Sequence, residues 1–179
     1  MVHICEQGIT IRPVGPDEAE RVLEVYRQCE DFLPLGPNPR ASLEMVMEDM
    51  RHSVEEGGTF HGIYLGEQQL VGVVDVVSQG FAGRPEHAFL LLLMIGAPYR
   101  RQGLGARVVA LVEREVWRNP QIATILAGVQ VNNPLAIAFW VRNGYRIISG
   151  AVAQADGTIT YELCKERQAA DEPEQDRRA

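Results

Sequence analysis

The residues with the clearest chemical potential form the turn Arg100-Arg101-Gln102-Gly103-Leu104-Gly105. It follows an apolar run at 88–95 and opens a helical pattern at 106–117. A helix N-terminus presents unpaired N–H groups and the positive end of the helix dipole, and glycine lets a ligand approach the backbone closely. The turn therefore predicts an anion site, and a phosphate group is the expected occupant.

Two common phosphate-binding motifs do not fit this turn. A Walker A loop would continue with Gly-Lys-Ser/Thr, and the dinucleotide fingerprint would need glycine where Val108 stands. The pattern Arg-x-x-Gly-x-Gly alone is only moderately specific, and the side chains of Arg100 and Arg101 can equally be ordinary surface charges. The ligand has to be inferred from the rest of the chain.

The elements that must position the turn alternate along the chain. Alternating or apolar runs predict strands at 9–12, 59–65, 70–78, 88–95, 122–131, 145–149 and 158–164. Helical patterns with caps at Asp17 and Ser42 predict helices at 17–30, 43–56, 106–117 and 134–143. The 88–95 run does not alternate, which indicates a central strand buried on both faces. Hairpins mixed with helical crossovers predict an α/β (α+β) fold with a mixed, mostly antiparallel central sheet flanked by helices.

Two segments in this order resemble the GNAT superfamily of acyl-CoA-dependent N-acyltransferases. The first is 95–106 and the second is 133–145, Asn-Pro-Leu-Ala-Ile-Ala-Phe-Trp-Val-Arg-Asn-Gly-Tyr. The resemblance runs from about Ile9 to Cys164 and implies a GNAT-like fold, which we expect to form a single domain over 1–167. The acidic, unpatterned composition of 168–179 predicts a disordered tail.

The resemblance also implies which residues bind the cosubstrate acetyl-CoA. Amides from Arg101 to Ala106 would hold the pyrophosphate. In this family the central strand before this turn commonly has a bulge and splays apart from the neighbouring strand. The Ile95 N–H would face the thioester oxygen, on which attack builds negative charge. The implied contacts are the backbone of Met94, Ile95 and Gly96, the turn residues Arg100, Arg101, Gln102, Gly103, Leu104, Gly105 and Ala106, and the side chains of Asn133, Ala136, Phe139 and Trp140. Asn133 can equally be a helix cap, and Asn132 is a competing choice.

The groups that move protons are less well defined. Many relatives use a tyrosine in the short helix as the acid, but Trp140 stands there, and an indole N–H is no acid near neutral pH. The central strand carries no carboxylate, so Asp75 and His87 are the catalytic candidates beside Ile95, with Glu86 and His61 as alternatives. Asp75 interrupts an apolar strand and either faces the cleft with a raised pKa or faces solvent. Proximity with water as the proton carrier is the remaining option.

These features favour an N-acetyltransferase that moves an acetyl group to a primary amine, on a small molecule or a peptide, by direct attack in a ternary complex. The alternative is an acyl-CoA-binding sensor or interaction module with little catalysis, which Trp140 and the acid-free strand favour. A nucleotide-binding domain without CoA is disfavoured by the second motif. The apolar segment 32–39 either packs on its own domain or forms a wall of the acceptor pocket.

Composition sets the remaining expectations. A net charge of -7 over 179 residues argues against a general nucleic-acid binder. The longest apolar run, 88–95, is far short of the about 20 residues that span a membrane, and 1–13 shows no signal-peptide pattern. Cys5, Cys29 and Cys164 have neither a disulfide framework nor metal-ligand spacing, so we expect reduced thiols, no metal and a cytoplasmic location. The resemblance allows for a homodimer.

Overall fold

The computed structural model describes residues 3–6, 8–66 and 68–168. Its strands are β1 Ile4–Glu6, β2 Ile9–Pro13, β3 Thr59–Leu65, β4 Gln69–Val77, β5 His87–Ile95, β6 Thr124–Gln130, β7 Arg146–Ile147, β8 Val152–Ala153 and β9 Ile159–Glu166. Its α-helices are α1 Ala19–Arg27, α2 Leu43–Glu55, α3 Leu104–Val116 and α4 Pro134–Arg142. Short 3₁₀ turns lie at Pro16–Glu18, Leu33–Leu35, Phe81–Gly83 and Ala97–Tyr99.

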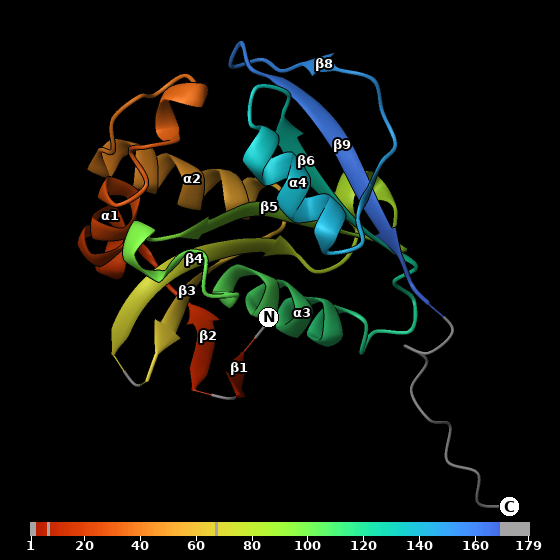
Figure 1. The fold of residues 1–179 in the computed structure, drawn as a ribbon. Helices are drawn as coiled ribbons and strands as arrows, with labels where there is room; N and C mark the ends of the chain where they lie inside the picture. Colours follow the sequence, from red (N-terminus) through yellow and green to blue (C-terminus); the bar gives the residue numbers. More distant parts are fainter. Residues whose placement is uncertain (1–2, 7, 67, 169–179) are drawn as a thin grey trace, which may run out of the picture.

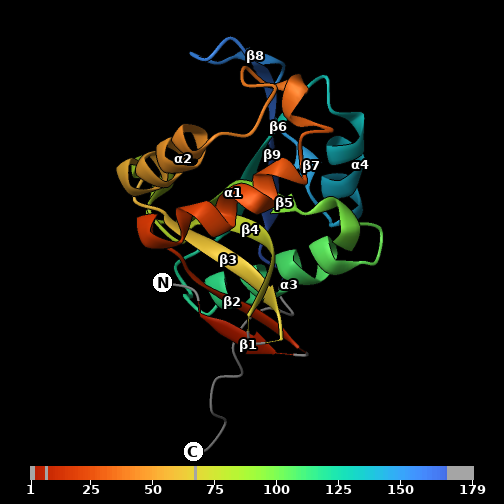
Figure 2. The same ribbon diagram turned by 90° about the vertical axis from the view of Figure 1, so that its left-hand side faces the viewer.

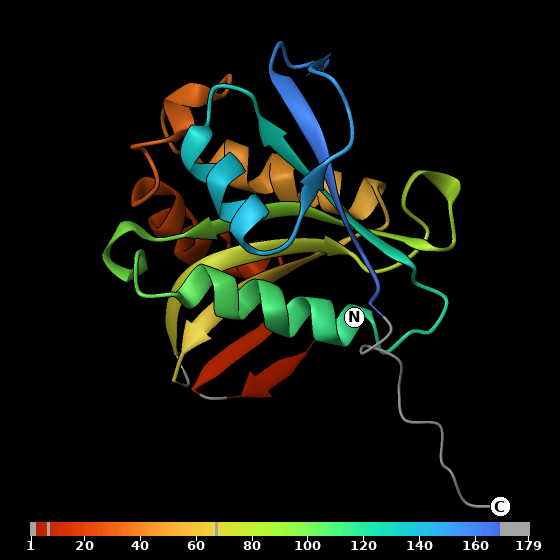
Figure 3. The ribbon, with the colours of Figure 1, turned by 45° about the vertical axis from the view of Figure 1, so that its right-hand side comes forward.

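All of these strands belong to one nine-stranded sheet, in which β1-β2-β3-β4-β5-β6-β9-β7 follow in order and β8 pairs with β9. The β5–β6 pair is parallel, and the other described pairs are antiparallel. Helices α1 and α2 cover one face, and α3 and α4 lie on the other (Figures 1 and 3). The predicted mixed, mostly antiparallel sheet flanked by helices is therefore confirmed.

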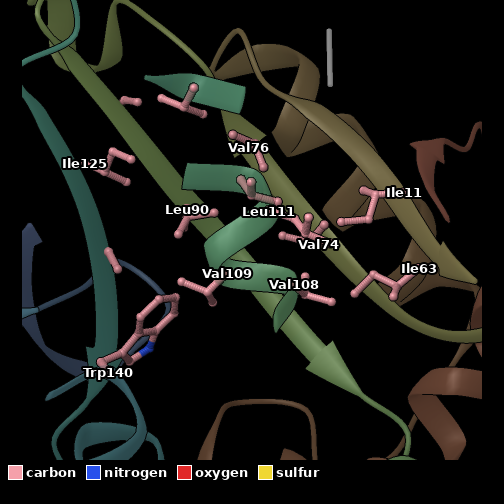
Figure 4. Packing of buried hydrophobic residues seen from close by; sticks show 14 of the residues in the cluster. Ile11, Ile63, Val74, Val76, Leu90, Val108, Val109, Leu111, Ile125 and Trp140 are labelled. Atoms are coloured by element: carbon pink, nitrogen blue, oxygen red, sulfur yellow. The ribbon is translucent and has the colours of Figure 1, made fainter. Parts of the chain in front are cut away.

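The sheet buries an apolar cluster on each face because its strands alternate. Along β4, Val74 and Val76 pack in the cluster on the α3 side, whereas Val73 packs in the cluster below α1 and α2. Figure 4 shows Val108 and Val109 of α3 packed over the strands on the first face. Removing these side chains from water fixes α3, and with it the turn at its N-terminus, against β5.

β5 contains the irregularity that shapes the site. Asp75 pairs with Leu92 but Val76 pairs with Leu90, so Leu91 is an extra residue and forms a β-bulge. β5 pairs with β6 only as far as Leu90 opposite Ala127, and the two strands diverge from there (Figure 1). Bulge and divergence thus begin at the same place, as the resemblance implied. Beyond Leu90, no described strand pairs with this edge of β5.

The prediction that the 88–95 strand is buried on both faces is wrong. Phe89 and the three residues 91–93 are only half-buried. An apolar run shows no alternation whether one face or both are covered, so the sequence does not reveal that β6 turns away. The divergence leaves these side chains beside an uncovered stretch of the sheet.

The predicted helix starts need two corrections. Asp17 does not cap α1, because it lies in the 3₁₀ turn that opens with Pro16, and α1 begins at Ala19 without a side-chain cap and ends at Arg27 rather than near 30. α3 begins at Leu104 rather than Ala106. The low helix propensity of Gly105 hid this first turn. The cap at Ser42 is confirmed, because its side chain accepts a hydrogen bond from the Met45 amide.

The strands near both ends of the domain also differ from the predicted ones. β1 was not predicted, since three residues carry too little pattern. The Asp156–Gly157 turn joins β8 to β9, whereas the predicted strand 145–149 is reduced to the two residues of β7. At the predicted boundary, Arg167 donates hydrogen bonds to the carbonyls of Trp117, Asn119 and Ile122. The predicted tail lies outside the described residues apart from Gln168.

Candidate active site

The N-terminus of α3 has the geometry of an anion site. Gly103 is its N-cap residue, with φ of 76° and no side-chain cap hydrogen bond. The Arg107 amide closes the first turn on the Gly103 carbonyl at 3.1 Å. The amides of the three residues 104–106 precede this bond, so helix geometry gives them no acceptor within α3. No acidic residue stands in this first turn to compete for them, so these amides suit a pyrophosphate.

Gly105 is the point where the turn, β5 and α4 meet. A Cβ atom at this position would lie 3.3 Å from Cε2 of Phe139 and 3.8 Å from Cγ1 of Ile95. Three groups that lie far apart in the sequence, and that were predicted to share one ligand, are therefore packed together. The half-buried side chain of Ala136 lies one helical turn from Phe139.

The backbone of β5 presents alternate amides to the diverging side. The Gly96 N–H donates a hydrogen bond to the Val71 carbonyl at 2.8 Å, and the strand register places Gly72 opposite Ile95. In an antiparallel ladder, bonded and non-bonded pairs alternate. The N–H groups of Met94 and Gly96 therefore point to β4, and those of Leu93 and Ile95 point toward the side where β6 turns away.

This alternation corrects one expectation and adds a residue. The N–H groups of Met94 and Gly96 are turned to β4, so they do not face a pantetheine arm lying between β5 and β6. Leu93 was missed, although the two-residue period of a strand, counted back from Ile95, would have indicated it. The Ile95 N–H points away from β4, and its contact with a thioester oxygen stays a prediction.

The side chain of Arg100 does not extend freely from the turn. Its Nε donates to the Ile95 carbonyl at 2.6 Å, and its Nη1 donates to the Asp31 carboxylate at 2.7 Å. Arg101 is exposed and holds φ of 60°, an unusual value for a residue with a side chain. Gln102, also exposed, donates to the Pro98 carbonyl at 3.1 Å. Of the two arginines, Arg101 is the better placed to meet a phosphate.

The start of α4 uses its two asparagines differently. Asn133 is the N-cap residue, and its side chain accepts a hydrogen bond from the Ala136 amide at 3.0 Å. Asn132 instead donates from its side chain to the Leu35 carbonyl at 3.1 Å. Asn133 thus has the helix-capping role that the sequence left open, and its contact with pantetheine stays a prediction.

Trp140 lies in the core rather than on a ligand-facing surface. Its side chain packs among the buried residues on the α3 side (Figure 4), and the residue is 6% exposed. The ring centroids of Trp140 and Tyr145 are 4.9 Å apart in an edge-on arrangement. The expectation that Trp140 lines the thiol end is not supported by this position, whereas Phe139 is half-buried on the side of Gly105.

Residues 20–145 match the sequence profile of the Acetyltransferase (GNAT) family, which is more than half of the chain. The chain belongs to this family. Among curated proteins, none matches the sequence.

Solved structures share the GNAT fold over nearly the whole chain. An acetyltransferase from Thermus thermophilus is 24% identical, with a TM-score of 0.72 over 93% of this chain and 100% of that one. AAC(6')-Ib in complex with ribostamycin and coenzyme A is 19% identical, with a TM-score of 0.73 over 95% and 99%. RimL, a ribosomal L7/L12 alpha-N-protein acetyltransferase bound to coenzyme A, is 12% identical, with a TM-score of 0.69 over 93% and 98%.

Asp75, a predicted catalytic residue of this GNAT chain, occupies neither of its two expected positions. It is 3% exposed, and its carboxylate accepts a hydrogen bond of 2.6 Å from the Ser53 hydroxyl of α2. Burial raises the pKa of Asp75 from 3.8 to about 6, although the Ser53 hydrogen bond acts in the opposite direction. The carboxylate therefore faces α2 rather than a cleft or solvent.

The other predicted bases also lie away from the C-terminal end of β5, where Ile95 lies. His87 opens β5 and lies eight residue steps along the strand from Ile95, a span of about 26 Å. Glu86 pairs with Arg84 at 2.7 Å beside His87. His61 is fully buried in β3. The structure therefore does not bring His87 together with Ile95, because the two residues lie at opposite ends of β5.

We expect the burial of Asp75 to make stability depend on pH. The folded pKa of about 6 lies above the unfolded value near 4, so the folded state binds the extra proton between these values. Stability from this group therefore falls as pH rises from about 4 to about 6, by about 3 kcal/mol. Asp75→Asn should remove this loss, so its free energy of unfolding, compared with wild type, should rise over that interval in urea titrations.

Asp156→Asn is the matched control for this measurement. Hydrogen bonds from Thr158 lower the pKa of Asp156, so this variant should lose stability relative to wild type as pH rises. Equal pH dependence in wild type and Asp75→Asn would contradict the prediction. Because Asp75 faces α2, we also expect kcat/KM on a true substrate to change little.

The described part of the chain shows neither a metal-ligand cluster nor a membrane span. Within 3–6, 8–66 and 68–168, no three His, Cys, Asp or Glu side chains are grouped to hold a metal ion. No helix in the same ranges has the length and apolar character needed to cross a membrane.

Proposed function

We propose that the protein transfers the acetyl group of acetyl-CoA to a primary amine, on a small molecule or a peptide, by direct attack in a ternary complex. The observation that carries this proposal is the placement of a helix N-terminus without a side-chain cap near the amides of Leu93 and Ile95, which point to the side where β6 diverges. The helix N-terminus suits a pyrophosphate, and the two strand amides suit the oxygen of a thioester. GNAT membership, and the amine acceptors named for AAC(6')-Ib and RimL, support the acceptor class.

The cosubstrate would lie along the diverging strands. The amides of 104–106 would hold the pyrophosphate, with Arg101 beside them as a positive charge. The N–H groups of Leu93 and Ile95 would face the pantetheine and the thioester. The Phe139 ring, packed at Gly105, would form the apolar side of this channel.

The reaction needs a lone pair on the acceptor nitrogen and a group that accepts the proton which this nitrogen loses. The amine nitrogen attacks the thioester carbon, and the carbonyl oxygen takes up negative charge that a backbone N–H stabilises. The C–S bond then breaks and its electron pair leaves on the CoA sulfur. The proton lost by the nitrogen replaces the one missing on that thiolate, so the products are the N-acetyl amine and CoA thiol.

We assign proton transfer to water. Trp140 is buried, and none of the predicted bases Asp75, His87, Glu86 and His61 lies at the end of β5. Holding the amine against the thioester can supply much of the rate without a protein base. A water-carried proton also predicts that the acceptor must arrive as the free amine, so turnover should rise with pH toward the acceptor's own pKa.

The full chain tests the proposal directly. It should bind CoA in calorimetry, and mixed with acetyl-CoA and a panel of amines it should release CoA thiol together with an N-acetylated product seen by mass spectrometry. The panel should contain an aminoglycoside, a polyamine and peptides with free N-termini. Tight CoA binding without turnover of any amine would instead favour the acyl-CoA-binding module, which the buried Trp140 makes the second candidate.

A further inference from the structure

A short segment lies across the place where β5 and β6 separate. We call it the 28–35 segment: it begins at Gln28, the C-cap residue that follows α1, and closes with the 3₁₀ turn Leu33–Leu35. Figure 2 shows it in orange between α1 and α4. It contacts the β5 side through Arg100 and the β6 side through Asn132. This segment therefore bridges both sides of the proposed acyl site.

The contact with β5 is centred on the Arg100 guanidinium. Nη1 donates to the two Asp31 carboxylate oxygens at 3.0 and 2.7 Å, and Nη2 donates to the Gln28 carbonyl at 3.3 Å. The guanidinium carbon lies 5.0 Å from the ring centroid of Phe32. Nε completes the set by donating to the Ile95 carbonyl at 2.6 Å. The turn at 100–105, which we call the cofactor turn because the proposed function places CoA there, thus uses one side chain to join three residues of the segment to the end of β5.

Two further contacts show how closely the segment is packed on β5. The Cys29 thiol lies 3.6 Å from the Ile95 carbonyl, in position to donate to it. The Gln28 amide oxygen lies only 2.2 Å from where a Cβ of Gly96 would be, so a larger residue at position 96 would require the Gln28 side chain to move. On the β6 side, a Cβ at Gly36 would lie 3.1 Å from Nε2 of Gln130.

The electrostatics of Arg100 argue against a phosphate as its partner. Its side chain is 26% exposed, and its Nε and Nη1 groups already donate to Ile95 and Asp31, so a phosphate bound to these groups would displace those partners. A partly buried guanidinium gains from fixed, charge-assisted partners such as this carboxylate. The arrangement holds the half-buried Phe32 ring against the same guanidinium that bonds the carbonyl of Ile95 at the end of β5.

We propose that Arg100 is a positioning residue that holds the 28–35 segment in place as the wall against which the acceptor amine binds. The inference rests on the proposed function, since only a transferase has an acceptor. Arg100 is then not a phosphate ligand. Its side chain instead couples the cofactor turn to acceptor binding. Loss of the contact should therefore affect the acceptor KM far more than the CoA affinity.

Arg100→Lys and Asp31→Asn test this from the two sides of the ion pair. Each should raise the acceptor KM, by about tenfold for Arg100→Lys, while the CoA Kd from calorimetry stays within about twofold. The double variant should be no worse than Arg100→Lys alone, because both changes break one contact. Amide hydrogen exchange of 28–35, followed by mass spectrometry, should become faster in both single variants.

Glu24→Gln is the matched control for Asp31→Asn. Glu24 is 62% exposed like Asp31 and pairs with Arg27 on α1, away from the turn. It should change neither KM nor exchange. If Arg100→Lys weakens CoA binding while Asp31→Asn leaves KM and exchange unchanged, Arg100 is a cofactor ligand and the proposal is wrong.

Amide hydrogen exchange tests the positioning role of Arg100, and turnover of amines by the wild-type enzyme tests the proposed transferase function. Unchanged exchange in both variants contradicts the positioning role even if the wild-type enzyme is active. Faster exchange in both, with no turnover of any amine by the wild type, contradicts the proposed transferase function and removes the acceptor role with it.

Discussion

Ile95→Pro is expected to lower kcat by roughly 100-fold or more while the protein stays folded and still binds acetyl-CoA, because the change deletes one backbone donor. The Ile95 N–H points away from β4, so proline breaks no ladder bond with that strand. The preceding Met94 already has the extended conformation that a following proline requires. Single-turnover kinetics with saturating acetyl-CoA would measure the loss.

The side chain and the N–H of Ile95 need to be separated in this experiment. Ile95 is 9% exposed, so its packing is also lost in the proline variant. Ile95→Ala keeps the N–H and removes the packing, and it should retain most of kcat. Equal kcat in the alanine and proline variants would show that this N–H is not the donor. If Leu93→Pro alone loses turnover, the donor is the Leu93 amide, the other amide that points away from β4.

Gly103→Val should raise the CoA Kd by roughly 10- to 100-fold, the cost of a charge-assisted hydrogen bond or more. Gly103 has φ of 76°, which a β-branched residue does not tolerate, although no atom lies within 4 Å of its Cβ position. The turn must therefore change its backbone, and the amides of 104–106 lose their common direction. Calorimetry with CoA would give the affinity.

Gly157→Val is the control for strain alone. Gly157 has φ of 83° and equally open surroundings, but it lies in the β8–β9 turn. Both variants should lose about 1–2 kcal/mol of stability in urea titrations. Only Gly103→Val should lose CoA affinity. An equal effect of both variants on CoA binding would mean that global destabilisation, and not the turn, is responsible.

Features set by local interactions were predictable from the sequence. The bounds of β3 and the Ser42 cap follow from strand alternation and N-cap chemistry. The turn at 100–105 before α3 was also predictable, because glycine, positive charge and a helix start lie next to each other in the chain. Its family resemblance then indicated the bulge and divergence of β5, which composition alone does not show.

Features set by distant partners were not predictable. Asp31 and Arg100 are 69 positions apart, and no local pattern pairs them. The direction of Asp75 depends on the docking of α2 and on its Ser53. His87 and Ile95 lie on one strand, and only the position of the divergence decides which end can hold a site. The sequence alone therefore left proton transfer open, whereas it did indicate phosphate binding.

The parallel β5–β6 pair has a consequence for the cooperativity of unfolding. Among the described strands it is the single junction between the β1–β5 part of the sheet and the β6–β9–β7 part, and it contains only four residue pairs. A junction this short is where the two parts are expected to separate first in local opening. A ligand lying along it contacts both parts at once and binds only when they are joined. We therefore expect CoA to suppress this opening and to raise the midpoint of thermal unfolding in proportion to the logarithm of its concentration.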